Sequence, residues 1–201
     1  EYANLDGLRV DTYPYIEMVP GSEWVKAIMD EYPNFNIVGE CWTRPTPAVA
    51  YWQSSVKNHN GFDSHLPSVM DFPLEEAIRQ ALESDNQGWG GGLTRVYDVL
   101  TMDYMYANVN DILIMLGNHD MDRIADVVKD QDPRRVKLAY TLLATMRGIP
   151  QVFYGDEYAM KSADRNLGHS TLRMPLPLGE EVTAEMQDMY DYQARLFQWR
   201  K

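Results

Sequence analysis

Residues 6–13, with the sequence DGLRVDTY, predict a short buried strand that ends on a carboxylate. Leu8 and Val10 alternate with Arg9 and Asp11, so the apolar and the charged side chains point to opposite faces. A buried charge is costly unless it is paired, and Arg9 and Asp11 share a face, where they can pair. Such a pair keeps the Asp11 carboxylate ionised. Asp11 is therefore a candidate nucleophile, provided that the chain supplies a partner acid.

Short apolar segments alternate with helical patterns along the chain. The predicted strands lie within residues 6–13, 35–40, 68–72, 111–117 and 151–154. The predicted helices cover residues 22–32 with Ser22 as N-cap and Trp24, Ile28 and Met29 on one face, 48–56, a segment from Pro73, 93–107, 133–147 with Gly148 as its stop, and 183–199. This alternation is typical of parallel βα units, in a (β/α)8 barrel or an open doubly wound sheet. No glycine-rich phosphate turn follows the first strand, which favours the barrel, with about three βα units missing on its N-terminal side.

The composition narrows the class of partner. A net charge of −12 argues against nucleic acid or an anionic membrane, since both require a basic surface, and it suits a neutral carbohydrate. The single cysteine, Cys41, excludes an internal disulfide. No run of about 18 apolar residues is present, so no membrane span is expected.

Carboxylates follow three of the predicted strands directly: Asp11, Glu40 and Asp120. The carboxyl ends of neighbouring parallel strands meet at one rim, where barrel enzymes carry their chemistry. Retaining glycoside hydrolysis requires an ionised nucleophile and a protonated acid about 5–5.5 Å apart. Apolar Val38 and Trp42 flank Glu40 and favour its protonated form. The alternative is that each carboxylate caps a loop or the next helix; the three together favour catalysis.

Four segments of the chain resemble motifs of the α-amylase family of glycoside hydrolases. They are GLRVD at residues 7–11, VGE at 38–40, NHD at 118–120 and GIPQVFYGDE at 148–157. They correspond to strands four, five, seven and eight of the family's catalytic barrel. The sequence ECW at residues 40–42 is most similar to neopullulanase and cyclomaltodextrinase-type members of bacterial starch-utilisation systems.

The resemblance implies a role for each motif residue. Asp11 is expected to be the nucleophile, Glu40 the general acid/base and Asp120 the transition-state stabiliser. Arg9 is expected to orient the nucleophile, and His119 to contact the glucose in the cleavage subsite. Where many α-amylases carry Lys-His shortly after the nucleophile, this chain has Tyr-Pro-Tyr at residues 13–15, which allows a neopullulanase-like specificity.

Residues 1–201 are expected to form a partial catalytic barrel, strands four to eight, with the N-terminal strands and a C-terminal β domain absent. The chain lacks an initiator Met and ends inside a helical pattern. The family's calcium-binding asparagine and its strand-three motif would lie upstream of residue 1. No cofactor is therefore expected in this piece, while calcium is possible in the full-length enzyme.

Three further side chains, Tyr13, Trp42 and Arg123, are candidate sugar contacts, and each could instead have a structural role. Tyr13 and Trp42 could stack on glucose faces, although aromatic side chains are more often core or loop anchors. Arg123 could bind a sugar hydroxyl or form a structural ion pair with Asp122 or Asp126. Asp156 and Glu157 follow the last strand, and the resemblance implies that their motif is mostly structural. The histidines His59, His65 and His169 lack the spacing of a metal site, so surface or satisfied polar roles are expected for them.

The expected activity is hydrolysis of α-1,4-glucosidic bonds in pullulan, cyclodextrins or maltooligosaccharides, through a covalent glucosyl-enzyme intermediate. Two alternatives are an α-glucan transglycosylase on the same fold and a non-catalytic glucan-binding relative. The isolated piece is expected to be inactive or nearly so, and either to self-associate, because an open sheet edge favours association, or to repack. A periplasmic or exported location is implied by the resemblance alone.

Overall fold

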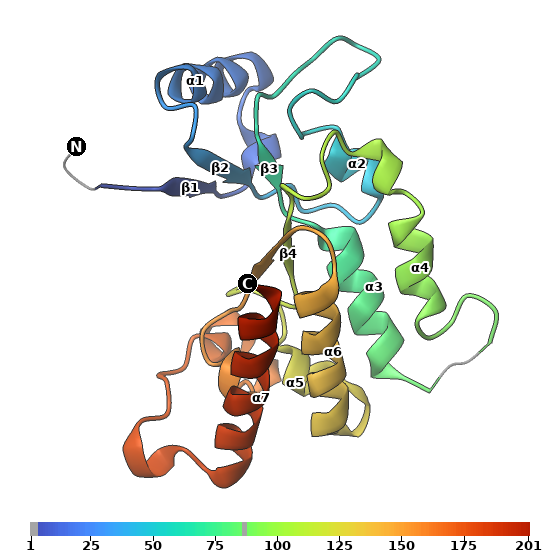
Figure 1. Ribbon diagram of the computed structural model, residues 1–201, viewed down its shortest axis with the longest axis vertical. Coiled ribbons are helices and arrows are strands. Elements are labelled where there is room, and N and C mark those ends of the chain that lie inside the picture. Colours follow the sequence, from blue (N-terminus) through green and yellow to red (C-terminus); the bar gives the residue numbers. More distant parts are fainter. Residues whose placement is uncertain (1–3, 86–87) are drawn as a thin grey trace. The chain divides into compact units, whose positions relative to one another are not determined.

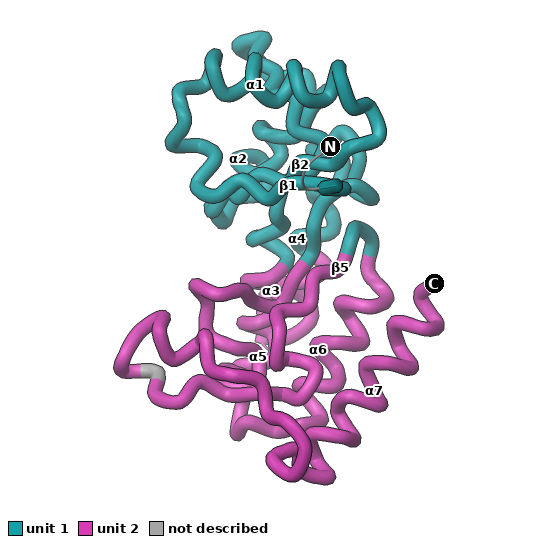
Figure 2. The backbone as a smooth tube through the Cα atoms, turned by 90° about the vertical axis from the view of Figure 1, so that its left-hand side faces the viewer, with its two compact units in different colours: residues 1–74, 98–114, 147–149 teal, residues 75–97, 115–146, 150–201 magenta. Residues whose placement is uncertain are grey.

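The computed structural model describes residues 4–85 and 88–201, which fall into two compact units (Figure 2). The first unit contains residues 1–74, 98–114 and 147–149, and the second contains residues 75–97, 115–146 and 150–201. Asp11 and Glu40 therefore lie in the first unit, and Asp120 lies in the second.

A parallel sheet forms the centre of the first unit (Figure 1). Its strand order is β1 (Gly7–Val10), β2 (Asn36–Gly39), β3 (Ser68–Val69). Val10 is in register with Gly39, so the chain leaves β1 and β2 at the same edge of the sheet. Past β3, Met70 forms an isolated parallel bridge to Leu113. Parallel pairing between strands joined by helices confirms the α/β class.

Two helices belong wholly to the first unit, α1 (Met18–Glu31) and α2 (Thr46–Ala50), with 3₁₀ turns at Tyr13–Tyr15 and Asp103–Met105. Helices α3 (Phe72–Glu83) and α4 (Thr94–Leu100) each begin in one unit and end in the other. The same holds for strands β4 (Leu113–Met115) and β5 (Ile149–Gln151). These two strands pair with each other. The core of the first unit is apolar and includes fully buried Val25, Ile37, Val49, Leu66 and Val69.

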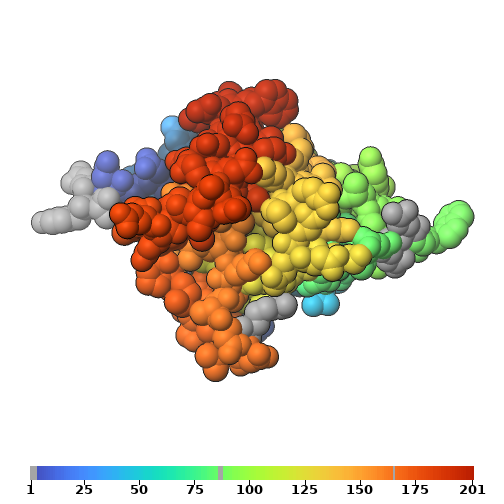
Figure 3. All heavy atoms as spheres, turned by 90° about the horizontal axis from the view of Figure 1, so that it is seen from below, coloured from blue at the N-terminus to red at the C-terminus, as the bar shows by residue number. Residues whose placement is uncertain are grey.

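The second unit is mainly helical. It contains α5 (Ile124–Val127), α6 (Pro133–Thr145) and α7 (Ala184–Arg200), with 3₁₀ segments at Lys129–Gln131, Asp156–Tyr158, Arg165–Leu172 and Gly179–Glu181. Helix α7 lies against α6, as the space-filling view shows (Figure 3). Both helices have a side-chain N-cap: Asp132 accepts a hydrogen bond from the Arg134 amide, and Thr183 accepts one from the Met186 amide.

The predicted N-terminus and buried face of α1 are wrong. The helix begins at Met18, so Ser22 lies inside it, and its hydroxyl donates to the Asp63 carbonyl oxygen at 2.7 Å. The buried residues are Gly21, Ser22 and Val25, while Trp24 is 44% exposed. A polar contact from a distant loop, which helical periodicity does not report, selects the buried face.

The bounds of other elements also differ from the prediction. Strand β5 is Ile149–Gln151 rather than 151–154, the helix predicted at 48–56 is α2 at Thr46–Ala50, and the helix predicted at 93–107 is shortened to α4. Helix α6 ends at Thr145 with Met146 as C-cap, so Gly148 is not its stop. Gly148 has a φ of +92°, and a Cβ there would lie 2.7 Å from the Ile112 carbonyl oxygen. The glycine is required by close backbone approach at the start of β5.

Strand β1 is less buried than predicted, because it is the edge strand of the sheet and only β2 flanks it. In the part of the chain that the structure describes, no helix is both long and apolar enough to cross a membrane.

Candidate active site

The ends of β1 and β2 bring Asp11 and Glu40 around one guanidinium. Arg9 Nη1 lies 3.0 Å from Asp11 Oδ1, and Arg9 Nη2 donates to Glu40 Oε1 at 2.6 Å. Thr12, in the left-handed region at φ 47°, donates its backbone N–H to Glu40 Oε2 at 2.9 Å. Each Glu40 oxygen thus has a donor, and Arg9 bridges the two carboxyl groups.

The two carboxyl groups differ sharply in environment. The Asp11 side chain is 65% exposed, while that of Glu40 is 4% exposed. Burial raises the pKa of Glu40 above its ordinary value; the Thr12 amide and Arg9 oppose this shift, and the neighbouring Asp11 adds to it. A raised pKa favours the protonated form, which a general acid requires. The pair is therefore an exposed carboxylate beside a buried acid.

The backbone under Glu40 is tightly packed. A Cβ at Gly39 would lie 2.6 Å from Leu66 Cδ1 and 3.4 Å from the Tyr13 side chain. The adjacent Cys41 is fully buried, and burial raises the pKa of its thiol, so it packs as a small apolar side chain. This packing fixes the position from which Glu40 projects.

The two aromatic candidates have different surroundings. The Trp42 ring stacks on Phe72 at 5.0 Å between centroids and an interplanar angle of 11°, and Trp42 is half exposed. Tyr13 is 2% exposed, packs edge-on against Trp52 and donates to the Ser64 carbonyl oxygen at 3.4 Å. Burial raises the pKa of Tyr13 to about 12. Trp42 retains accessible surface for a ligand, whereas Tyr13 is a core side chain.

A second cluster surrounds Asp120 in the second unit. His119 Nε2 lies 3.1 Å from Asp120 Oδ2, and Oδ1 is approached by Arg173 Nη2 at 2.9 Å and His169 Nδ1 at 3.2 Å. The Asp120 amide donates to Asn118 Oδ1 at 2.8 Å, which shapes the turn after β4. The carboxylate is thus contacted by three basic side chains.

The sequence places His119 beside Asp120 but gives no indication of Arg173, and for His169 it predicts a surface or satisfied polar role. Both lie in the irregular stretch between residues 159 and 183, where neither spacing nor periodicity marks a site. No local signal could have found them, because their contact with Asp120 spans about fifty residues of chain.

Arg123 is buried at 1% exposure in the second unit. It pairs with Asp156 at 2.7 Å and donates to the carbonyl oxygens of Tyr154 at 2.9 Å and Leu172 at 2.8 Å. Burial raises the pKa of Asp156 to about 6, with Arg123 acting in the opposite direction. The ion pair uses Asp156, a carboxylate that the sequence analysis had placed in a structural role.

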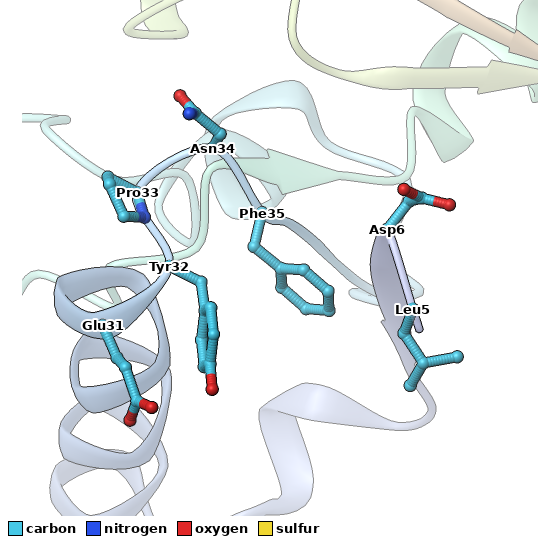
Figure 4. A pocket seen from close by; sticks show the side chains of 7 residues that line it. All are labelled: Leu5, Asp6, Glu31, Tyr32, Pro33, Asn34 and Phe35. Carbon is cyan, nitrogen blue, oxygen red and sulfur yellow. The ribbon is translucent and has the colours of Figure 1, made fainter. Parts of the chain in front are cut away.

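A surface pocket of about 370 Å³ lies at the amino end of β1 in the first unit, at the opposite end of the strand from Asp11 (Figure 4). Its lining consists of Leu5, Asp6, Glu31, Tyr32, Pro33, Asn34 and Phe35. None of the candidate site residues lines it. Within residues 4–85 and 88–201, no group of three or more His, Cys, Asp or Glu side chains is arranged to hold a metal ion.

Comparisons with known proteins agree on one family. The family described as "Alpha amylase, catalytic domain" matches residues 2–199. The chain is 29% identical over 161 residues to a cyclomaltodextrin glucanotransferase of Geobacillus stearothermophilus, covering 78% of this chain and 20% of that relative. The chain therefore spans about a fifth of the length of this curated relative.

Two solved structures have a similar fold. An alpha-amylase of Anoxybacillus has a TM-score of 0.76 at 22% identity, covering 98% of this chain and 39% of that one. A cyclic alpha-maltosyl-(1→6)-maltose hydrolase of Arthrobacter globiformis, in complex with maltose, has a TM-score of 0.74 at 21% identity, covering 97% of this chain and 40% of that one.

Proposed function

Because this chain belongs to the alpha-amylase catalytic-domain family, we propose that the protein carrying it is a retaining glycoside hydrolase of starch-type glucans. Its substrates are α-1,4-linked: pullulan, cyclodextrins or maltooligosaccharides. The observation that carries the proposal is the Arg9–Asp11–Glu40 cluster, in which one guanidinium bridges an exposed carboxylate and a buried acid. A similar structure contains maltose, which supports a glucan ligand.

In the proposed reaction the two carboxyl groups act in turn. An Asp11 oxygen attacks the anomeric carbon while Glu40 gives its proton to the departing glycosidic oxygen, so that the glycosidic bond breaks and a glucosyl ester forms. Glu40, now a carboxylate, removes a proton from water. The water oxygen then displaces Asp11 from the anomeric carbon and releases the sugar with retained stereochemistry.

The remaining site residues have supporting roles in this proposal. Arg9 orients Asp11, Asp120 offsets the positive charge that develops on the sugar, and His119 contacts the glucose in the cleavage subsite. Trp42 offers a half-exposed ring for stacking on a glucose face. Tyr13 and Arg123, both buried, support the site from the protein side rather than by direct contact with sugar.

The assignment of the described strands to positions four to eight of a (β/α)8 barrel belongs to the same proposal. So do the neopullulanase-like specificity and a periplasmic or exported location.

Transfer is the second candidate function, because a cyclomaltodextrin glucanotransferase is among the similar proteins. In transfer, a sugar hydroxyl replaces water in the second step and displaces Asp11. Chromatography of the products formed at high maltotriose separates the two: longer oligosaccharides or cyclic products indicate transfer, and glucose and maltose alone indicate hydrolysis.

Replacement of the nucleophile tests the proposal. In the protein that carries this chain, Asp11→Asn should reduce pullulan turnover by at least about a thousandfold, because no covalent intermediate can form. Asp30→Asn, a surface carboxylate on α1 that pairs with Lys26, is the matched control and should leave turnover unchanged. Undiminished turnover in Asp11→Asn would exclude Asp11 as the nucleophile.

A further inference from the structure

Arg173 contacts the turn that carries Asp120 at two points. Its Nη2 lies 2.9 Å from Asp120 Oδ1, and its Nε donates to the His119 carbonyl oxygen at 3.4 Å. One planar guanidinium therefore contacts both a side chain and the backbone of adjacent residues. A rigid fork of this kind restricts orientation as well as position, which a flexible ammonium group does not.

The backbone that carries Arg173 is itself anchored in the core. The preceding residue, Leu172, is 3% exposed, and its carbonyl oxygen accepts a hydrogen bond from the buried guanidinium of Arg123 at 2.8 Å. Thr171 is also buried and donates its hydroxyl to the Gly168 carbonyl oxygen. The backbone from which the Arg173 side chain reaches Asp120 is thus held in place.

The two Asp120 oxygens are held from different sides. His119 lies against Oδ2, while Arg173 and His169 lie against Oδ1. A guanidinium has only N–H donors, so Arg173 can only donate to Oδ1, whereas the role of His169 Nδ1 as donor or acceptor depends on its tautomer. Arg173 is therefore the partner of Oδ1 whose donor role is fixed.

We propose that Arg173 is a positioning residue, which sets the orientation of the Asp120 carboxylate toward the reacting sugar. The inference rests on the proposed function, in which Asp120 stabilises the transition state. An oriented carboxylate stabilises developing positive charge without reorganising during the reaction. Loss of Arg173 leaves only the two histidines on the Asp120 carboxylate and removes the guanidinium that holds Oδ1, so the effect falls on kcat more than on KM.

The test uses the protein that carries this chain and an activated aryl maltoside, whose good leaving group keeps slow variants measurable. Arg173→Gln should lower kcat about ten- to a hundredfold, with KM changed less than about threefold. Arg173→Lys retains the charge without the fork and should recover part of kcat. Arg134→Gln removes an exposed arginine at the start of α6 and should leave kcat unchanged.

A double-mutant cycle separates positioning from a general structural role. In an Asp120→Asn background, Arg173→Gln should have little further effect, because the group through which Arg173 acts has already been altered. Tm should change little, since the Arg173 side chain is 51% exposed and exposed ion pairs contribute little to stability. A multiplicative loss of kcat in the double variant would overturn the inference.

Failure of the inference is distinguishable from failure of the proposed function. If Asp11→Asn and Asp120→Asn abolish turnover while Arg173→Gln has wild-type kcat, only the positioning role is wrong. If Asp11→Asn and Asp120→Asn both retain wild-type turnover, the proposed function is wrong and the role of Arg173 falls with it.

Discussion

Arg9, which is expected to orient the nucleophile, and Arg123, a candidate sugar contact, occupy opposite environments. The Arg9 side chain is 30% exposed and is shared between two carboxyl groups at the strand ends. Arg123 is fully buried, and its terminal nitrogens bind one carboxylate and two carbonyl oxygens. The residue type is the same, but only Arg9 lies beside groups that solvent or a ligand can reach.

The comparison shows how burial separates a structural arginine from a site arginine. A buried ion pair is stable only while both partners remain, because an unpaired charge in the interior is strongly destabilising. Arg9 is partly exposed, so water can replace its contact with the exposed Asp11, and the buried Glu40 can remain neutral because burial raises its pKa. Loss of Arg123 should therefore reduce the free energy of unfolding more than loss of Arg9 does. Loss of Arg9 should have the larger effect on catalysis.

The largest effect is expected for Arg123→Met. The substitution removes the guanidinium from Asp156 and leaves a buried carboxyl group without its cation, so the free energy of unfolding should fall by about 3–5 kcal/mol. Urea titration of the protein that carries this chain measures this loss in the free energy of unfolding. Arg134→Met, on an arginine at the protein surface, is the control. A loss below about 1 kcal/mol would show that the buried pair contributes as little as a surface pair.

A smaller change in stability, of at most about 1 kcal/mol, is expected for Arg9→Met. Its main effect is on the acid: Arg9 holds the pKa of Glu40 down against burial, so its removal should raise that pKa further. The high-pH limb of kcat/KM, which reports ionisation of the general acid, should move to higher pH. Lys26→Met, at an exposed ion pair on α1, should leave the pH profile unchanged. If the high-pH limb of kcat/KM does not move in Arg9→Met, Arg9 does not influence the pKa of Glu40.

The smallest effect is expected for Glu40→Gln, which should change how the free energy of unfolding depends on pH. The pKa of Glu40 is raised in the folded protein above its ordinary 4.5, so the protonated carboxyl favours folding below that pH. This contribution is lost as pH rises through the folded pKa. The unfolding free energy of the wild type minus that of Glu40→Gln should therefore decrease from pH 4.5 upward.

Chemical denaturation at a series of pH values measures this difference. Glu23→Gln, at an exposed position of α1, is the control substitution. A difference that increases with pH would mean that Arg9 and the Thr12 amide outweigh burial at Glu40.

Local sequence was sufficient for several elements. Alternation in β1 and the short apolar run of β2, together with the carboxylates that follow them, predicted where Asp11 and Glu40 would lie. The starts of α6 and α7 were predicted to within one residue, because a helix start is marked by contacts between residues two or three positions apart. The buried face of α1 and the bounds of β5 were not predicted, because both depend on contacts with distant segments.

The sequence by itself determined the βα alternation, the family and the three carboxylates, because each is written in short motifs and short-range periodicity. Only the tertiary structure decided that Arg123 and Tyr13 are buried, that Trp42 retains an exposed surface and that Arg173 contacts Asp120. The physical reason is that burial and ion pairing depend on which distant segments meet. Arg123 joins Asp156 across 33 positions and Arg173 joins Asp120 across 53, separations over which periodicity carries no information.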